Sequence, residues 1–61
     1  MFSITKDYST LNFSRDFVRA YTYDFDEDGD VYYLVIYLFD GDFIEVDDLD
    51  TIYDFLDFMG F

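Results

Sequence analysis

Apolar side chains dominate residues 31–39, VYYLVIYLF, and occupy both alternating sets of positions. β-branched and aromatic residues favour strands, and a run that is apolar on both sides is typical of a central strand. Asp-Gly pairs stand on either side of this run, within DEDGD at 26–30 and DGD at 40–42. Because glycine supplies the positive φ that tight hairpin turns need, the pattern predicts a central strand between two hairpin turns.

The neighbouring segments provide partners for this strand. Residues 42–46, DFIEV, predict a short third strand. Residues 17–25 predict a strand that alternates Phe17, Arg19, Tyr21, Tyr23 and Phe25 on one face with Val18, Ala20, Thr22 and Asp24 on the other. Two interpretations of the N-terminal region stay open. Residues 1–5 can add a further strand, and apolar positions in residues 9–16 and beyond also fit one or two helical turns.

The C-terminal segment, VDDLDTIYDFLDFMGF, has the period of an amphipathic helix. A core-facing stripe is predicted at the spacing i, i+3, i+4, i+7, i+10, consisting of Leu49, Ile52, Tyr53, Leu56 and Met59. Asp47 or Asp48 is placed to cap the start of the helix, and Gly60 is placed to end it.

These elements predict one α+β domain over residues 1–61. Its fold is a small antiparallel β-meander of three to four strands, with one C-terminal amphipathic helix packed on one face. A single helix covers a single face of a sheet. The other face then requires the N-terminal segment, a second copy of the chain or a partner to cover it, so a homodimer is one possible arrangement.

Composition supports folding and reveals an unusual charge. The chain is 52% hydrophobic and 26% aromatic, which is unlike disordered acidic segments. The net charge is −12, and residues 20–61 hold thirteen carboxylates and no cation. Lys6, Arg15 and Arg19 all lie in the first nineteen residues, beside Asp7 and Asp16. Solvated surfaces usually intersperse both signs, so the polyanion needs an explanation.

Several function classes are disfavoured by what the chain lacks. With no Cys and no His, Ser3, Ser9 and Ser14 have no evident activating partner, so we expect no enzyme and no cofactor. Three cations against fifteen acids cannot provide a phosphate-binding surface, so no direct nucleic-acid binding is expected. The absence of cysteine and of a long apolar run favours a soluble, unprocessed cytoplasmic protein that binds no membrane.

Residues 24–31, DFDEDGDV, resemble the first two thirds of an EF-hand calcium loop. Carboxylates stand at loop positions 1, 3 and 5, followed by Gly at 6. Val35 occupies position 12, where an EF-hand has a bidentate Glu, and the following run predicts a strand instead of a helix. A calcium-binding or generic acidic interaction module at this turn is therefore the alternative function, with Asp24, Asp26, Asp28 and Asp30 as its ligands.

The acids also form regular patterns. Asp47, Asp50, Asp54 and Asp57 recur along one side of the predicted helix, although Asp54 and Asp57 oppose the helix dipole and Asp50–Asp54 is a like-charge pair. Asp24, Asp26, Asp28 and Asp30 alternate along the first hairpin. In extended chain they would lie about 6.5 Å apart, which is similar to successive phosphates on one strand.

In size, charge and aromatic content, the chain resembles the DNA-mimic inhibitors that phages and other mobile elements use against host nucleases, restriction enzymes, CRISPR effector complexes and uracil-DNA glycosylase. The resemblance implies a class of function: an acidic inhibitor that blocks the basic DNA-binding surface of a host defence or DNA-processing protein. Exposed aromatic side chains at Phe58 and Phe61 are predicted to add apolar contact. The predicted partner-binding acids are Asp24, Asp26, Glu27, Asp28, Asp30, Asp40, Asp42, Asp47, Asp50, Asp54 and Asp57.

Overall fold

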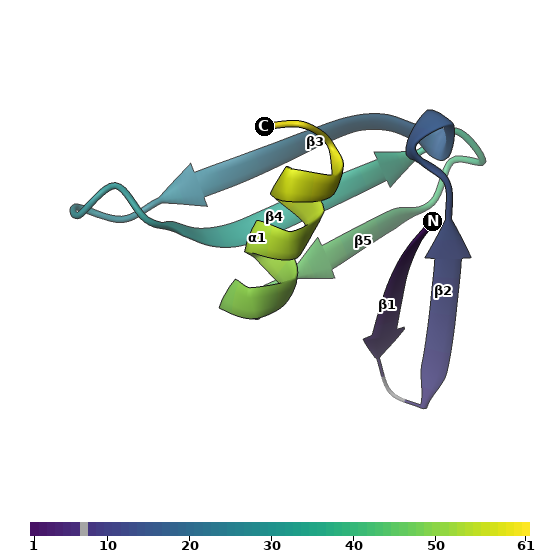
Figure 1. Ribbon diagram of the computed structural model, residues 1–61, viewed down its shortest axis with the longest axis horizontal. Coiled ribbons are helices and arrows are strands. Elements are labelled where there is room, and N and C mark those ends of the chain that lie inside the picture. Colours follow the sequence, from purple (N-terminus) through teal and green to yellow (C-terminus); the bar gives the residue numbers. More distant parts are fainter. Residues whose placement is uncertain (7) are drawn as a thin grey trace.

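The computed structural model describes residues 1–6 and 8–61, and of Lys6 only the backbone. Five strands and two helical segments follow one another along the chain (Figure 1). They are β1 (Phe2–Lys6), β2 (Ser9–Phe13), the 3-10 turn η1 (Arg15–Phe17), β3 (Val18–Phe25), β4 (Val31–Leu38), β5 (Phe43–Val46) and the helix α1 (Leu49–Phe58).

The strands form two antiparallel sheets. β3, β4 and β5 make a three-stranded meander with β4 in the centre, and β1 and β2 make a separate hairpin. The predicted α+β class and the central strand are confirmed. The helical interpretation of residues 9–16 is wrong for Ser9–Phe13, which pairs with β1, and only the short η1 turn follows it. Pairing places Phe2 opposite Phe13, so both rings can pack on the same side of the hairpin.

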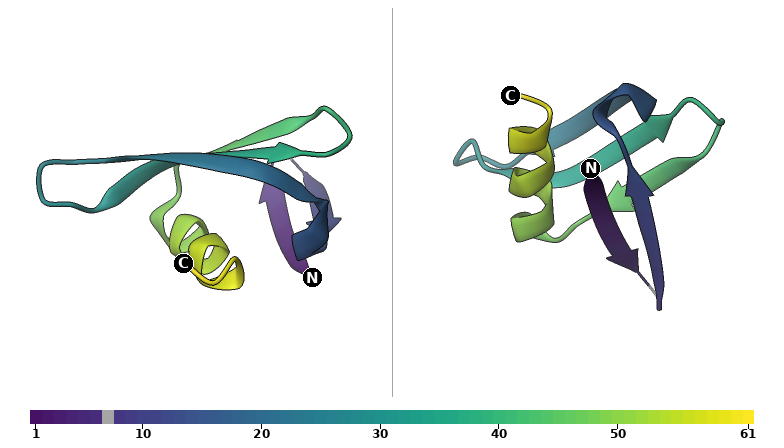
Figure 2. Two further views of the ribbon diagram at one scale, coloured as in Figure 1. Left: turned by 90° about the horizontal axis from the view of Figure 1, so that it is seen from above. Right: turned by 45° about the vertical axis from the view of Figure 1, so that its right-hand side comes forward.

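Both additional layers lie on the same side of the meander. Figure 2 (left) shows α1 and the β1–β2 hairpin beneath the sheet, next to each other, with no described element on the opposite face. The N-terminal segment therefore does not cover the second face. We call this second face the open face and define it by the alternate residues that point away from α1: Ala20, Thr22, Asp24, Tyr33, Val35, Tyr37, Phe43 and Glu45.

The core lies between the meander and α1. Leu34, Ile36 and Leu38 point from β4 toward the helix and are at most 2% exposed. Phe55 of α1 is 0% exposed, and its ring centroid lies 5.5 Å from that of Phe2 and 5.4 Å from that of Tyr21, both in edge-on geometry. Aromatic pairs of this kind stabilise a core beyond the area that they bury. Phe55 thus joins hairpin, helix and sheet.

The predicted helix stripe is partly wrong. Ile52 and Leu56 are buried as expected and Met59 is half-buried, but Leu49 is 52% exposed and Tyr53 is 46% exposed. Phe55 and the half-buried Phe58 take their places. The hairpin lies beside the helix on the same face of the sheet, so the apolar contact extends toward the rings of the hairpin.

The predicted alternation of β3 is wrong at its first residues. Phe17 lies in η1, and the strand pairing shifts between Val18 and Ala20. This irregularity turns Val18 toward the core, against which it packs, while Tyr21 and Tyr23 keep their predicted side. An extra residue in one strand reverses the faces of the residues before it. At the end of β4, Phe39 lies in the turn and is exposed.

The ends of α1 follow the sequence signals. Asp48 is the N-cap, and its side chain accepts a hydrogen bond from the backbone N–H of Thr51 at 3.0 Å. At the other end, Gly60 has φ +83, and the N–H groups of Gly60 and Phe61 donate to the carbonyls of Asp57 and Leu56. This is a Schellman arrangement, which satisfies carbonyls that would otherwise be without donors.

We predict that Phe55→Ala lowers the free energy of unfolding by about 3–5 kcal/mol, because it removes a buried ring and leaves a cavity. A loss of that size removes most of the stability expected of so short a domain. Leu49→Ala, at the exposed stripe position, should cost less than about 1 kcal/mol. Urea denaturation of both variants measures the difference. Equal losses would contradict the described orientation of the helix.

Candidate partner-binding surface

Every described carboxylate is exposed, and no described charged side chain is buried. The carboxylates therefore make no part of the core. Most of them fall into four groups, the β3–β4 turn, the β4–β5 turn, the outer side of α1 and the open face, whereas Asp16 lies apart from these groups in η1. The geometry of each group decides which of the predicted partner-binding acids can act together.

The β3–β4 turn folds back on itself around Asp26. Its Oδ1 accepts hydrogen bonds from the backbone N–H groups of Asp28 and Asp30, both at 3.0 Å. The N–H of Asp26 donates to the carbonyl of Asp30 at 2.9 Å, and Gly29 adopts φ +85. Short acidic side chains often capture nearby N–H groups in this way. The predicted extended row of carboxylates at phosphate-like spacing is therefore wrong. The turn nevertheless contains four acidic residues, Asp26, Glu27, Asp28 and Asp30.

The calcium alternative finds no ligand cluster in the part of the chain that the structure describes, because no three acidic side chains there are grouped to hold a metal ion. One carboxylate oxygen of Asp26 is engaged by two backbone N–H groups. Asp24 lies within β3 and points to the open face, whereas the other three predicted ligands lie in the turn. The turn is held by its own hydrogen bonds.

The β4–β5 turn lies at the other end of the meander (Figure 1). Asp40 accepts a hydrogen bond from the N–H of Asp42 at 2.9 Å, which closes this turn locally. The carbonyl of Phe17 accepts a hydrogen bond from the N–H of Phe39, so η1 lies beside the turn. Arg15 and Arg19 are in and next to η1. Asp40 and Asp42 therefore lie at the end of the molecule that also carries these two arginines.

The acids of α1 lie on its solvent side. Asp50, Asp54 and Asp57 are exposed, and the residues that α1 buries, Ile52, Phe55 and Leu56, lie on its other side. The first turn of the helix contains Asp50, where a negative charge is favourable, but the last turn contains no basic residue. Asp47 precedes the helix and is also exposed. The exposure of these acids on the side away from the buried residues agrees with the predicted placement of the acidic residues on this helix.

The open face surrounds one tyrosine with carboxylates. Partial burial of the Tyr33 ring raises its pKa above the ordinary value, and the nearby charges of Glu45, Asp47 and Asp24 raise it further. The side chain of Tyr33 also forms a hydrogen bond with Glu45. Neither Tyr33 nor Glu45 was among the predicted site residues. The signal was present in the alternation of β4 and β5, which places both on one face.

The two aromatic residues predicted as exposed contacts differ. Phe58 is half-buried, and its ring centroid lies 5.2 Å from that of Phe2, so its predicted role as an exposed contact is wrong. Phe61 is 70% exposed, and its ring centroid lies 5.4 Å from that of Tyr23. Phe61 is available to a partner, whereas Phe58 belongs to the core that holds the hairpin against the helix.

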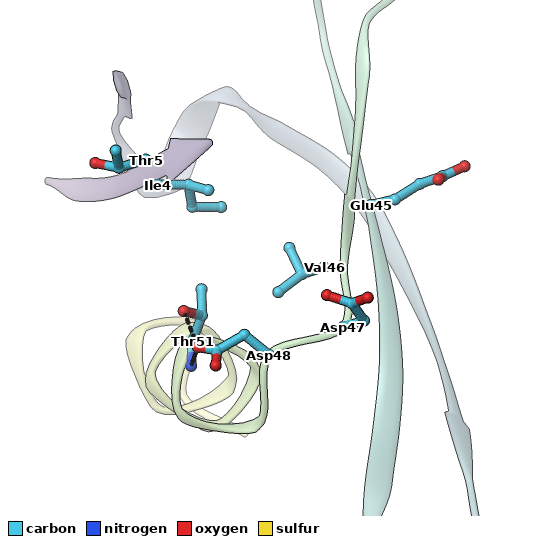
Figure 3. A pocket seen from close by; sticks show the side chains of 7 residues that line it. All are labelled: Ile4, Thr5, Glu45, Val46, Asp47, Asp48 and Thr51. Carbon is cyan, nitrogen blue, oxygen red and sulfur yellow. Dashed lines mark hydrogen bonds between the residues drawn. The ribbon is translucent and has the colours of Figure 1, made fainter. Parts of the chain in front are cut away.

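A small cavity lies between β1, β5 and the start of α1 (Figure 3). Its volume is about 120 Å³, below the roughly 300–1,000 Å³ of typical small-molecule sites. In Figure 3, Ile4 and Val46 face this space, Asp48 is hydrogen-bonded to Thr51, and Glu45 points away on the other side of β5. A second cavity of about 280 Å³ is lined by Ile4, Ser9, Thr10, Leu11 and Ile44, a set without a carboxylate.

Comparison with protein-family models, curated proteins and solved structures finds no match to this chain. Within residues 1–6 and 8–61, no helix has the length and apolar character that a membrane crossing requires.

We predict that the cap at Asp48 makes α1 sensitive to acid. The Thr51 hydroxyl, at 2.6 Å, and the Thr51 N–H both donate to the carboxylate, and they lower the pKa of Asp48. A lowered pKa contributes stability above the ordinary aspartate pKa, and this contribution is lost as pH falls through the lowered value. Asp48→Ala should lower the melting temperature at pH 7 by roughly 4–8 °C.

Asp48→Asn is the matched control for this prediction, because asparagine caps a helix without titrating. The advantage of the wild-type protein over Asp48→Asn should shrink when melting temperatures are measured below the ordinary aspartate pKa. A constant difference between the two proteins at both pH values would contradict the assigned role of the charge.

We predict that Glu45→Gln lowers the pKa of Tyr33, because it removes one of the negative charges that oppose ionisation of the phenol. Since the pKa is raised in the folded protein, this contact contributes stability below the ordinary tyrosine pKa and loses it as pH rises through the raised value. Titration of the ring carbon resonances by NMR measures the shift. Asp57→Asn, on the outer side of the helix, is the control and should leave Tyr33 unchanged; equal effects would contradict the prediction.

Proposed function

We propose that this protein is an acidic DNA mimic, encoded by a phage or other mobile element, that inhibits a host defence or DNA-processing protein. It binds the basic DNA-binding surface of a CRISPR effector complex, restriction enzyme, nuclease or glycosylase and blocks access of DNA. The protein acts by binding, without catalysis and without a cofactor. The contact acids are those of the β3–β4 turn and the outer side of α1, with the β4–β5 turn at the far end.

The observation that carries this proposal is that every described carboxylate is exposed on an elongated body. A net charge of −12 is distributed along a longest dimension of 33 Å, or roughly 2.8 Å for each charge. Duplex DNA carries one charge for about every 1.7 Å of its axis, and a single strand carries one for about every 3.4 Å. The charge density of the protein therefore lies between those of a single strand and a duplex.

The distribution of charge also supports the proposal, because stability does not account for it. Asp54 and Asp57 lie near the negative end of the helix dipole. There, Arg15 of η1 donates a hydrogen bond to the carbonyl of Met59 at 3.2 Å, but α1 itself has no basic residue in its last turn. Asp50 and Asp54 are a like-charge pair at i, i+4, which destabilises a helix. A net charge of this size also lowers the stability of the folded state, because the carboxylates repel one another. A basic partner surface offsets these costs and accelerates association by electrostatic steering.

The shape of the molecule favours a target with a groove. The acids of the helix and those of the β3–β4 turn come from different elements and extend over more than one side of the body. A flat partner surface would meet one group, whereas a cleft that normally encloses nucleic acid meets several at once. The mimicry then consists of a negative field over an elongated body, and it does not need carboxylates at the positions of individual phosphates.

We predict that reversing the charge of Glu27, Asp28, Asp54 and Asp57 to Lys weakens inhibition at least tenfold. Asp26 is kept because it holds the turn together. The target is isolated from a bacterial lysate on the immobilised protein, released by competing DNA and identified by mass spectrometry. Its DNA binding is then measured by fluorescence anisotropy with increasing amounts of each variant. Circular dichroism should show an equal or higher melting temperature, because Lys at 54 and 57 favours the helix dipole.

Asp16→Lys is the matched control for a single reversal at Asp54. Both substitutions change the charge equally on exposed side chains, but Asp16 lies in η1 beside the arginines. Asp54→Lys should weaken inhibition several-fold and Asp16→Lys less than twofold. A folded quadruple variant that inhibits as well as the wild-type protein would overturn the proposal, as would equal effects of the two single reversals.

A further inference from the structure

The open face is an unpartnered sheet surface with a definite chemical layout. Its central strand, β4, presents Tyr33, Val35 and Tyr37 in alternation. Val35 lies between Thr22 of β3 and Glu45 of β5, and Tyr37 lies between Ala20 and Phe43. The ring centroids of Tyr37 and Phe43 are 6.4 Å apart, and Phe43 is 60% exposed. One end of the face is thus aromatic and apolar.

The other end of the same face is acidic. Asp24 is the strand partner of Tyr33, and the charges of Glu45 and Asp47 act on the same phenol. Figure 3 shows Glu45 pointing away from the helix side of β5, toward the open face. An aromatic end and an acidic end, with Tyr33 among the acids, therefore share one surface that no described element covers (Figure 2).

This layout matches one kind of side chain in particular. The arginine guanidinium stacks on aromatic faces and pairs with carboxylates through a planar fork of donors. Lysine, a compact and strongly hydrated charge, pairs with carboxylates but gains less from stacking. Charge complementarity opposes the other occupants. A second copy would bring another net charge of −12 and its own acids to the same face, and nucleic acid would bring phosphates.

We infer that the open face is a docking surface for an arginine-bearing segment of a partner protein, which it binds by stacking on Tyr33 and Tyr37 and pairing with Asp24. Val35 and Phe43 add apolar contact area, the contribution that was predicted from the sequence for Phe58 and Phe61. The inference deepens the proposed function by naming the side chains of the target that are recognised. It rests on the proposed function only in taking the partner to be a DNA-binding protein. Recognition of arginine itself can be measured with peptides, without the target protein.

The test compares two peptides of equal length and charge, nona-arginine and nona-lysine, by isothermal titration calorimetry in 150 mM sodium chloride. The wild-type protein should bind nona-arginine roughly three- to tenfold more tightly than nona-lysine, as stacking on two half-buried rings of the open face implies. The double variant Tyr33→Leu, Tyr37→Leu keeps an apolar surface but removes the aromatic faces. Its preference for arginine should fall to less than twofold.

Matched acid variants locate the site. Asp24→Asn on the open face should reduce the arginine preference, because the guanidinium loses its forked partner. Asp54→Asn removes the same charge from the outer side of α1 and should weaken both peptides equally, leaving the preference intact. In the wild-type protein, nona-arginine should also shift the NMR resonances of Tyr33, Val35 and Tyr37 more than those of α1, a result that requires no variant to fold.

Several outcomes would overturn the inference. Equal binding of the two peptides, an arginine preference that survives in the folded leucine variant, or shifts confined to α1 would each exclude the open face as an arginine site. A dimer in sedimentation that dissociates on Val35→Asp would assign the face to a second copy. If the charge-reversed variant still inhibits but the wild-type protein prefers nona-arginine, the proposed function is wrong and this inference stands. If charge reversal abolishes inhibition but the two peptides bind equally, this inference is wrong and the proposed function stands.

Discussion

The packing of Phe55 against rings from three other elements is the interaction on which the rest of this fold depends. Its side chain is fully buried, and it meets Phe2 and Phe13 of the hairpin as well as Tyr21 of the meander. Together with the contacts of Phe58 with Phe2 and Phe13, this packing holds the β1–β2 hairpin in place, since hairpins alone are marginally stable in water. The core contains few residues, but their side chains are large, so they bury enough apolar area for a short chain to fold despite its charge.

The same packing explains why one face of the meander stays open. The rings of the hairpin and the helix gather around Phe55, so both layers lie on one side of the sheet. None of the described elements forms a layer on the other side. β4 nevertheless carries Val35 and two tyrosines there, which gives the open face an aromatic character that solvent alone would not favour. The packing of both layers on one side therefore determines which side chains of β4 face solvent.

The acidic surface and the open face make different contributions to binding. Exposed carboxylates act over distance, so they set the rate and the salt dependence of an encounter with a basic partner. Stacking and apolar contact act only at short range, and they determine how long the complex lasts. The proposed function uses the first property and the inferred arginine recognition uses the second. The proposed function requires both, because long-range attraction by itself distinguishes poorly among basic surfaces.

Much of the local structure follows from the sequence by itself. The Asp-Gly turns, the apolar run of β4, the helix period and the Gly60 stop identify the meander and α1, and the one-sided distribution of charge identifies the acidic surface. Local patterns suffice here because each depends on backbone preference or on alternation within one element.

Only the tertiary structure decided on which side of the sheet each layer lies and how α1 is rotated about its axis. Phe55 and Phe58 replaced Leu49 and Tyr53 because a hairpin distant in sequence lies beside the helix, and the shift in pairing at Val18 arose between two strands. The turn around Asp26 closed through hydrogen bonds that charge patterning does not reveal. Tyr33 joined Glu45 because register, a property of paired strands, brings separate segments onto one face.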